Sequence, residues 1–348
     1  MKKILLLAVI CLSLAAGSAA LVVTTTPGLK AAVRLADLLL PGHLSAVSVQ
    51  GSMAGQATFT GLHYADRTRV AAVDRLSFTW RPAALLRKKL HVSFLEIAGF
   101  TMENKTAGNT GDRPAAGGPR SLPQLPVSIY LEKVRGSSWT MGSSAEDSLQ
   151  IDGFSLDEAL LDKHRVVIGH GEVYAPAFSI EVEGEWRQGG KAPPAYLAIR
   201  YDLRPPGFYP LAGRGRVRGS LEELHFSTRL EKPFAGVVTG SVSELTGALR
   251  WQVQLETGRA GLAEVGRGWP DVVLTGLQAS GTGTTGSYAL QIATDARYGD
   301  FEQVHIMTTL QGDAQGLQLD DTRIADRNGE LNGKAQLGWQ DAFSWQAE

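Results

Sequence analysis

The chain opens with an apolar segment that contains no charge. Ile4–Val23 holds about 20 residues and directly follows Lys2 and Lys3. A helix of this length spans roughly 30 Å, the thickness of the hydrocarbon core of a bilayer. Basic residues before such a segment favour a cytoplasmic N-terminus, with the rest of the chain on the opposite side of the membrane. We therefore predict a transmembrane signal-anchor helix over residues 1–24, in a single-pass topology.

A cleaved signal peptide has a similar pattern. It needs a basic start, an apolar middle and small residues at the cleavage site, and Ser18, Ala19 and Ala20 would serve. The apolar run continues through Leu21–Val23, which makes it longer than most signal peptide cores. This length favours the uncleaved anchor, and the cleaved form stays open.

The next pattern is that of a short amphipathic helix. Thr26 and Pro27 suit an N-cap and a first helical position, and Pro41 followed by Gly42 ends the periodic stretch. Two interpretations follow, a helix packed on the core or a helix at the outer surface of the membrane. The apolar positions have the spacing of one helical face: Leu29, Ala32, Val33, Ala36 and Leu40.

From Leu44 onward the apolar positions follow a period of two. Leu76, Phe78 and Trp80 alternate with polar residues, as in a half-buried strand. Residues 81–89 then predict one short helical turn, residues 142–173 predict short strands, and residues 262–268 predict a short helical insert. Residues 106–123 are rich in Gly and Pro, which predicts a flexible loop. We thus expect a first groove segment over 25–105 and a repeated β-groove over 124–348.

The later strands have one apolar and one polar face. A strand every 10 to 12 residues would give roughly 25 strands, and a sheet of that size must curl or split. We predict a mainly β fold in which a long, curled, largely antiparallel sheet forms an elongated apolar groove. A sandwich or a closed barrel would also hide the apolar face. The predicted groove lining comprises Leu76, Phe78, Trp80, Leu197, Ile199, Tyr201, Leu249, Trp251, Val253, Leu255, Tyr288, Leu290, Ile292, Val304 and Ile306.

Composition excludes several classes of function. The net charge is −1 with 20% charged residues, which lacks the basic surplus of nucleic-acid-binding proteins. The single cysteine, Cys11, lies inside the apolar run, so the rest of the chain has no disulfide and no thiol nucleophile. The 40 glycines suit many strands joined by tight turns.

No motif in the sequence indicates catalysis. Gly281–Gly286 matches GxGxxG, but a strand pattern follows it where a dinucleotide site needs a helix, so we predict a hairpin turn. His164 and His170 lack metal-ligand spacing, and GxSxG is absent. We expect no enzyme, no metal and no cofactor. Alternating arginines at Arg214, Arg216 and Arg218 predict a solvated strand face, with contact to anionic head groups as the alternative.

Two long segments resemble a known family. TTTPGLKAAVRLADLLLPG followed by LSAVSVQGSMAGQATFTGLHY resembles the start of TamB, and FTWRPAALLRKKLHVSFLEIAGFTM resembles a segment shared with the wider AsmA-like proteins. The match is closest over Leu5–Met102 and looser over Val127–Arg204. Gly247–Glu256 and Gly338–Glu348 form a weak repeat, and the last strand pattern stops unfinished. We therefore expect an N-terminal part of a longer protein.

The resemblance implies an inner-membrane-anchored periplasmic protein of Gram-negative bacteria with a long, apolar β-groove. Its partners would be the inner membrane, phospholipid acyl chains and a TamA-like outer-membrane barrel, the last through a C-terminal region absent here. Implied roles are phospholipid transport between the membranes and the assembly and secretion of outer-membrane proteins. A scaffold that accepts client strands by β-augmentation, a structural sandwich and an undetected hydrolase remain alternatives. None of the resembling motifs is catalytic.

Overall fold

The structure is a computed structural model in which a defined set of residues is described. The predicted anchor and the predicted loop over 106–123 both lie outside this set. Within the set, every helix is too short or too polar to cross a bilayer. The described residues are 25–40, 42–52, 54–66, 69–104, 127–142, 149–163, 165–187, 195–220, 222–245, 249–299, 301–313, 315–338 and 344–347.

The chain divides into two compact units. The described residues up to Pro176 belong to unit 1, and those from Ala177 onward belong to unit 2. This division falls inside the segment 124–348, which the sequence predicts to be one repeated β-groove. We describe each unit by itself.

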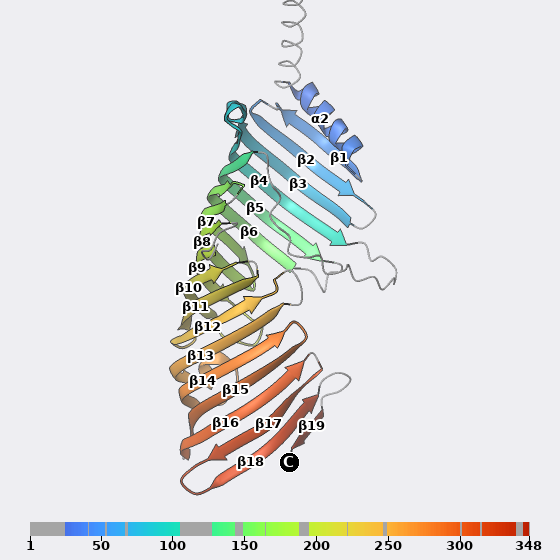
Figure 1. Cartoon of the computed structure of the whole chain (residues 1–348). Coiled ribbons are helices and arrows are strands. Elements are labelled where there is room, and N and C mark those ends of the chain that lie inside the picture. Colours follow the sequence, from blue (N-terminus) through green and yellow to red (C-terminus); the bar gives the residue numbers. More distant parts are fainter. Residues whose placement is uncertain are drawn as a thin grey trace, which may run out of the picture. The chain divides into compact units, whose positions relative to one another are not determined.

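Unit 1 is a sheet of seven strands with one helix laid over its first strand (Figure 1). The strands lie side by side in chain order, and all pairs are antiparallel except β4 with β5, which is parallel. The elements are α2 (Thr26–Leu39), β1 (His43–Gly51), β2 (Gln56–Ala65), β3 (Arg69–Arg81), the 3₁₀ helix η1 (Pro82–Arg87), β4 (Lys89–Asn104), β5 (Ser128–Gly142), β6 (Leu149–Leu161) and β7 (Arg165–Ala175).

Unit 2 is an antiparallel meander in which each strand pairs with the next one along the chain. Its elements are β8 (Phe178–Arg187), β9 (Ala195–Leu203), β10 (Leu211–Gly219), β11 (Glu223–Lys232), β12 (Gly236–Ser243), β13 (Arg250–Gly261), α3 (Leu262–Val265), β14 (Val273–Thr284), β15 (Ser287–Tyr298), β16 (Phe301–Asp313), β17 (Gly316–Ala325), β18 (Glu330–Gly338) and β19 (Ser344–Ala347).

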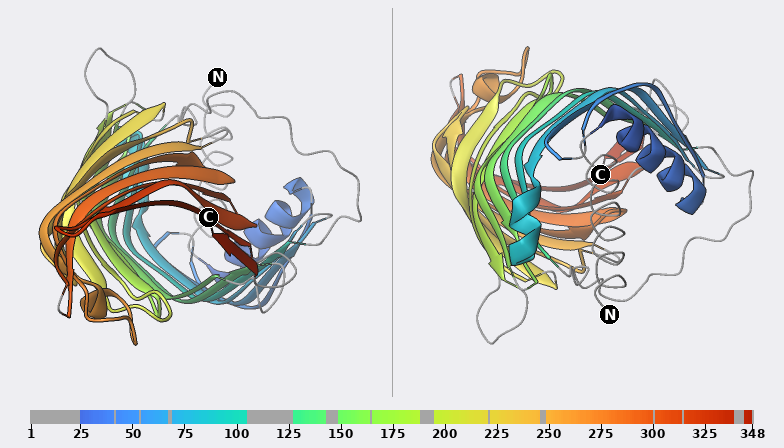
Figure 2. Two further views of the ribbon diagram at one scale, coloured as in Figure 1. Left: turned by 90° about the horizontal axis from the view of Figure 1, so that it is seen from below. Right: turned by 90° about the horizontal axis from the view of Figure 1, so that it is seen from above.

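The mainly β, curled and largely antiparallel architecture is confirmed. In both units the strands bend along their length (Figure 2), and the described residues include no second sheet stacked on either one. The stacked sandwich is therefore excluded for the described part of the chain. The short turns predicted at 81–89 and near 262–268 are η1 and α3. Gly281–Gly286 is the β14–β15 hairpin, as predicted.

The predicted number of strands was too high. The described residues form nineteen strands rather than roughly 25, because individual strands reach 16 residues in β4 and 15 in β5. The strands predicted to be short between 142 and 173 are also long, with 13 residues in β6 and 11 in β7. Glu158 has a φ of 56°, and this irregularity inside β6 interrupts the alternation from which strand length is estimated.

Helix α2 packs on the sheet, which was one of its two predicted roles. Leu29 is only 3% exposed and forms a buried cluster with Val49, Ala57 and Phe59, against which Val33 packs. Leu35 and Leu38, on the other side of the helix, are exposed.

Hydrogen bonds hold α2 along β1. Thr26 was predicted as the N-cap, but it is the first residue of the helix, and its hydroxyl donates to the Gly51 carbonyl over 3.0 Å. Near the other end of the helix, Asp37 accepts a hydrogen bond from the Leu44 amide over 2.7 Å. The helix thus lies beside an edge strand that would otherwise be open to pairing.

Candidate functional site: the apolar face of the sheets

Strand register in unit 2 gathers apolar side chains into rows. Leu255 on β13 lies opposite Ala279 on β14, and Ala279 lies opposite Ile292 on β15. The next row runs from Val253 through Gly281 to Leu290, and on to a leucine of β16. Because side chains alternate between the faces of a strand, these rows all lie on one face.

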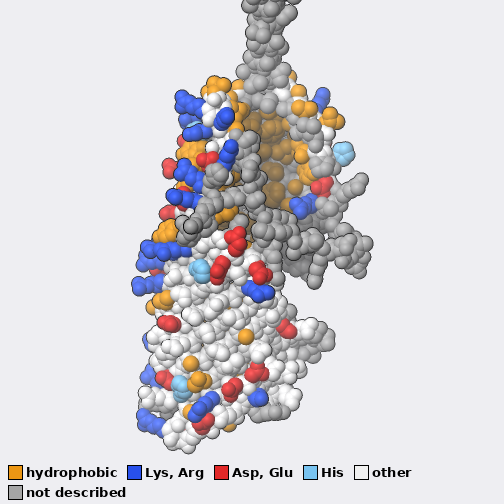
Figure 3. All heavy atoms as spheres, viewed as in Figure 1, with side chains coloured by type: hydrophobic (Ala, Val, Ile, Leu, Met, Phe, Trp, Pro, Cys, Tyr) orange, Lys and Arg blue, Asp and Glu red, His pale blue; other side chains and the backbone are white. Residues whose placement is uncertain are grey.

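This apolar face is not covered as a protein core is. Trp251, Val253, Leu255, Leu290 and Ile292 are all partly exposed. Among the described residues, no large side chain is less than 2% exposed. A contiguous apolar surface that stays in contact with solvent usually marks a binding surface. The opposite face, seen for unit 2 in Figure 3 on the outer side of the bent strands, is mainly polar.

Aromatic rings lie across glycines of the neighbouring strand. A Cβ atom on Gly312 would come within 2.5 Å of the Tyr288 ring, and one on Gly283 within 2.5 Å of the Trp251 ring. The Trp251 ring is also held by its Nε1–H, which donates to the Thr284 carbonyl over 3.1 Å. The absence of a side chain on glycine therefore lets each ring lie close to the sheet. The same arrangement joins Tyr201 to Gly213, Phe226 to Gly240 and, in unit 1, Phe154 to Gly136.

Unit 1 has its own apolar face, visible as a hollow lined with hydrophobic side chains in Figure 3. The Trp139 ring lies 4.6 Å from Phe100 and 4.7 Å from Phe154, between centroids. Its Nε1–H donates to the Ile97 carbonyl over 3.4 Å. These three rings come from β4, β5 and β6, so the aromatic cluster depends on pairings between distant parts of the sequence.

The family follows from comparison with known proteins. The family model described as "TamB, N-terminal domain" matches residues 15–138 and 120–348. The chain belongs to the TamB N-terminal domain family. No curated protein and no solved structure matches the chain.

Most of the predicted lining residues lie on one face of unit 2, as the strand register shows. Leu249 directly precedes β13 and is partly exposed. Leu76 and Phe78 lie in unit 1, packed against the buried cluster under α2, and Trp80 follows them on β3. Their role as a lining for acyl chains stays a prediction. The residues that share one face of unit 2 are Leu197, Ile199, Tyr201, Trp251, Val253, Leu255, Tyr288, Leu290, Ile292, Val304 and Ile306.

Several residues of the same faces were not predicted as lining. In unit 2 the register adds Val238 and Val242 of β12 and Leu277 of β14. Their strands are interrupted by Gly, Ser and Thr, so the apolar period is weak in the sequence. The cluster of Phe100, Trp139 and Phe154 in unit 1 was also missed. Its only sequence signal was the aromatic character of the three residues.

The arginines predicted to contact head groups lie on the opposite, polar face of unit 2. Nε of Arg214 lies 2.9 Å from Oε1 of Glu231, and the Arg218 guanidinium lies 5.1 Å from the centre of the Tyr196 ring. Arg216, between them, is exposed. A hollow of about 690 Å³ lies beside Arg214 and Arg216. Their contact with head groups stays a prediction, for a surface separate from the apolar face.

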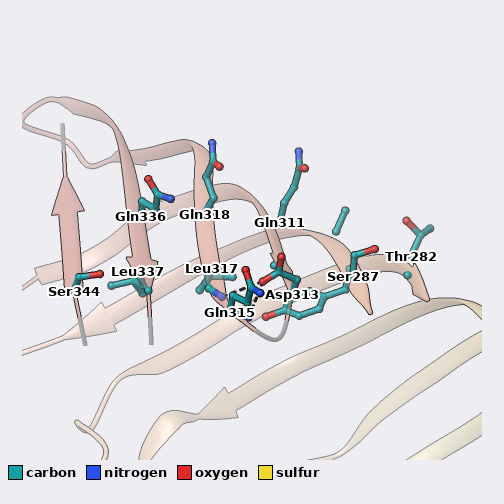
Figure 4. A pocket seen from close by; sticks show the side chains of 16 residues that line it. Thr282, Ser287, Gln311, Asp313, Gln315, Leu317, Gln318, Gln336, Leu337 and Ser344 are labelled. Carbon is teal, nitrogen blue, oxygen red and sulfur yellow. Dashed lines mark hydrogen bonds between the residues drawn. The ribbon is translucent and has the colours of Figure 1, made fainter. Parts of the chain in front are cut away.

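Glutamines form a row on the same polar face. Gln311, Gln318, Gln336 and Gln346 pair in register across β16 to β19. Figure 4 shows the first three projecting to one side of the sheet, beside a hollow of about 930 Å³. Neutral amides can hydrogen bond to each other along such a row. Gln311, Gln318 and Gln336 are exposed, so their amides can also hydrogen bond to water.

Proposed function

We propose that this chain carries phospholipid acyl chains along its apolar face, as part of a TamB-type protein anchored in the inner membrane. The family match supports a TamB-type role in transport and assembly. The observation that carries the proposal is the partly exposed apolar face of unit 2, which has no second layer among the described residues. A surface that carries lipid must be both apolar and accessible. An ordinary protein core is apolar, but it is not accessible.

The energetics of lipid transfer agree with such a surface. Moving an acyl chain through water costs about 0.8 kcal/mol per CH₂, or roughly 12 kcal/mol for a chain of about 16 carbons. A continuous apolar surface removes most of this barrier without any chemical step. Rings that lie close to the sheet, such as that of Trp251 over Gly283, project little from this surface.

The ends of the pathway form part of the proposal. The apolar segment Ile4–Val23 would anchor the chain in the inner membrane, with the sheets in the periplasm. Lipid would move towards the outer membrane, where a TamA-like barrel would be the partner. Assistance in the assembly and secretion of outer-membrane proteins would use the same connection.

The test exchanges two residues of one apolar row for aspartate. Leu255→Asp with Ile292→Asp puts two charges on the apolar face, on either side of Ala279. The matched control is Gln254→Asp with Gln291→Asp, one position along each strand and on the polar face, on either side of Ser280. The measurement is the phospholipid that co-purifies with the full chain, per mole of protein.

We expect the amount of phospholipid bound to the apolar-face variant to fall by roughly threefold or more. A bound acyl chain would bury the two charges without a partner, which is costly. The polar-face control should keep it. Circular dichroism establishes that both variants are folded. Equal phospholipid on both folded variants would exclude the apolar face as the carrying surface.

A further inference from the structure

Helix η1 exposes two leucines at the turn between β3 and β4. Leu86 is 90% exposed and Leu85 is 43% exposed. The turn is fixed by backbone hydrogen bonds, since the Lys88 amide donates to the Leu85 carbonyl over 2.9 Å and the Lys88 carbonyl accepts from the Ser128 amide over 3.1 Å. Lys88 has a φ of 56° and ends η1. The leucines are therefore held at the surface by a defined turn.

Basic residues surround these leucines. Arg81 directly precedes η1, Arg87 is its last residue, and Lys88 and Lys89 follow; all four are exposed. The acidic partner near this turn is Glu132, which lies 3.6 Å from Arg81 and 3.2 Å from His91. No ion pair involves Arg87, Lys88 or Lys89 within the described residues. The turn thus combines exposed apolar groups with a surplus of positive charge.

The turn lies at the same end of unit 1 as the start of α2 (Figure 1). Thr26, at the start of α2, contacts the last residue of β1. The following hairpin brings Gly55 to the end of β3, where the Trp80 amide donates to its carbonyl over 3.2 Å. Both elements therefore lie at the end of the sheet where the chain leaves the apolar segment Ile4–Val23.

We propose that η1 docks unit 1 on the surface of an anionic phospholipid bilayer. Leu85 and Leu86 enter the boundary between head groups and acyl chains, and Arg87, Lys88 and Lys89 contact the anionic head groups. This combination of apolar and basic side chains is the one that binds membrane interfaces. The proposal concerns how unit 1 is oriented at a membrane, and it does not depend on lipid transport by the apolar face.

The experiment reports the depth of η1 directly. In full-length protein with Cys11→Ser, a nitrobenzoxadiazole fluorophore is attached at Ala83→Cys, an exposed position within η1. The control label is at Val47→Cys on β1, which is 86% exposed in the same unit. Each protein is mixed with vesicles of equimolar phosphatidylglycerol and phosphatidylcholine that carry a head-group nitroxide lipid. Pure phosphatidylcholine vesicles with the same nitroxide lipid serve for comparison.

We expect quenching at position 83 to exceed quenching at position 47 by roughly threefold in the anionic vesicles only, and to fall at high salt. Leu86→Ser, and separately the triple change Arg87→Gln, Lys88→Gln and Lys89→Gln, should each remove the excess. Equal quenching at 83 and 47, or an excess that survives both changes, would overturn the proposal. The triple variant should still co-purify with phospholipid, which distinguishes this proposal from the transport function.

Discussion

The apolar faces of the two units differ in how far other elements cover them. In unit 1 helix α2 lies over the first strands and buries Leu29 with Val49 and Phe59. In unit 2 the described residues offer only the four-residue α3, and the rows of β13 to β16 stay partly exposed. One period-two pattern thus produces a local core where a helix covers it and an accessible surface where none of the described residues covers it.

This difference has an energetic consequence. A buried leucine contributes through the loss of all its contact with water, and a half-exposed one contributes only part of that amount. The covered end of unit 1 should therefore depend on side-chain packing. Unit 2 should depend more on the backbone pairing between its strands. Removal of comparable side chains from the two units tests the contrast.

The largest effect is expected for Leu29→Ala. The truncation leaves a cavity beneath α2 and should lower the stability of β1 to β3 by about 2–4 kcal/mol. Leu290→Ala, on the open face of unit 2, should cost only about 1 kcal/mol. The measurement is the free energy of opening from amide hydrogen exchange, compared between β1–β3 and β13–β16. Leu38→Ala is the control on the same helix, because Leu38 is 81% exposed and should change little.

Equal losses from Leu29→Ala and Leu290→Ala would contradict the contrast. They would mean that the apolar face of unit 2 is covered in solution by something that contributes as α2 does.

A smaller effect is expected from filling the glycine beneath a ring. In unit 1 a Cβ on Gly136 would overlap Phe154, whose ring is confined by Trp139 at 4.7 Å. Gly136→Val should therefore destabilise β5 and β6 by about 1–3 kcal/mol. In unit 2 the atoms nearest to a Cβ on Gly312 belong to the Tyr288 side chain, which is partly exposed. Gly312→Val should cost less stability and instead lower the amount of bound phospholipid.

Urea unfolding gives the stability of these two variants, and phospholipid co-purification gives the second readout. Gly258→Val is the control, because no described residue other than its chain neighbours lies within 4 Å of the added Cβ. A Gly312→Val variant that loses stability as Gly136→Val does, with its lipid content unchanged, would mean that Tyr288 belongs to a closed core.

The sequence predicted the parts of this fold that depend on neighbouring residues. The period of two around Trp251 and Leu255 placed both on one face, and Pro82 and Leu262 opened the expected short helices. The sequence did not predict the irregularity at Glu158, because one residue with positive φ leaves no pattern. It also did not predict which aromatic ring lies over which glycine. That choice depends on strand register, which is a property of two strands together.

The smallest predicted effect concerns the polar face of unit 2 at low pH. Glu330 accepts hydrogen bonds from Asn332 on the same strand over 3.0 Å and from Arg323 over 2.6 Å, and the bond from Arg323 ties β18 to β17. These bonds, that from Asn332 first, lower the pKa of Glu330 below its ordinary value of 4.5. Because the folded pKa is lowered, the stabilisation is complete above about pH 4.5 and disappears as the pH falls through the folded pKa.

The measurement is the difference in urea midpoint between the unchanged protein and Glu330→Gln at a series of pH values. The difference should be small and constant near neutral pH, since the pair is exposed, and it should vanish in acid. Leu29→Ala should show no comparable dependence, because the cluster under α2 contains no carboxylate. A Glu330→Gln effect that persists unchanged in acid would mean that the side chain acts through packing. The polar face of unit 2 would then resemble the covered end of unit 1 more closely than its exposure suggests.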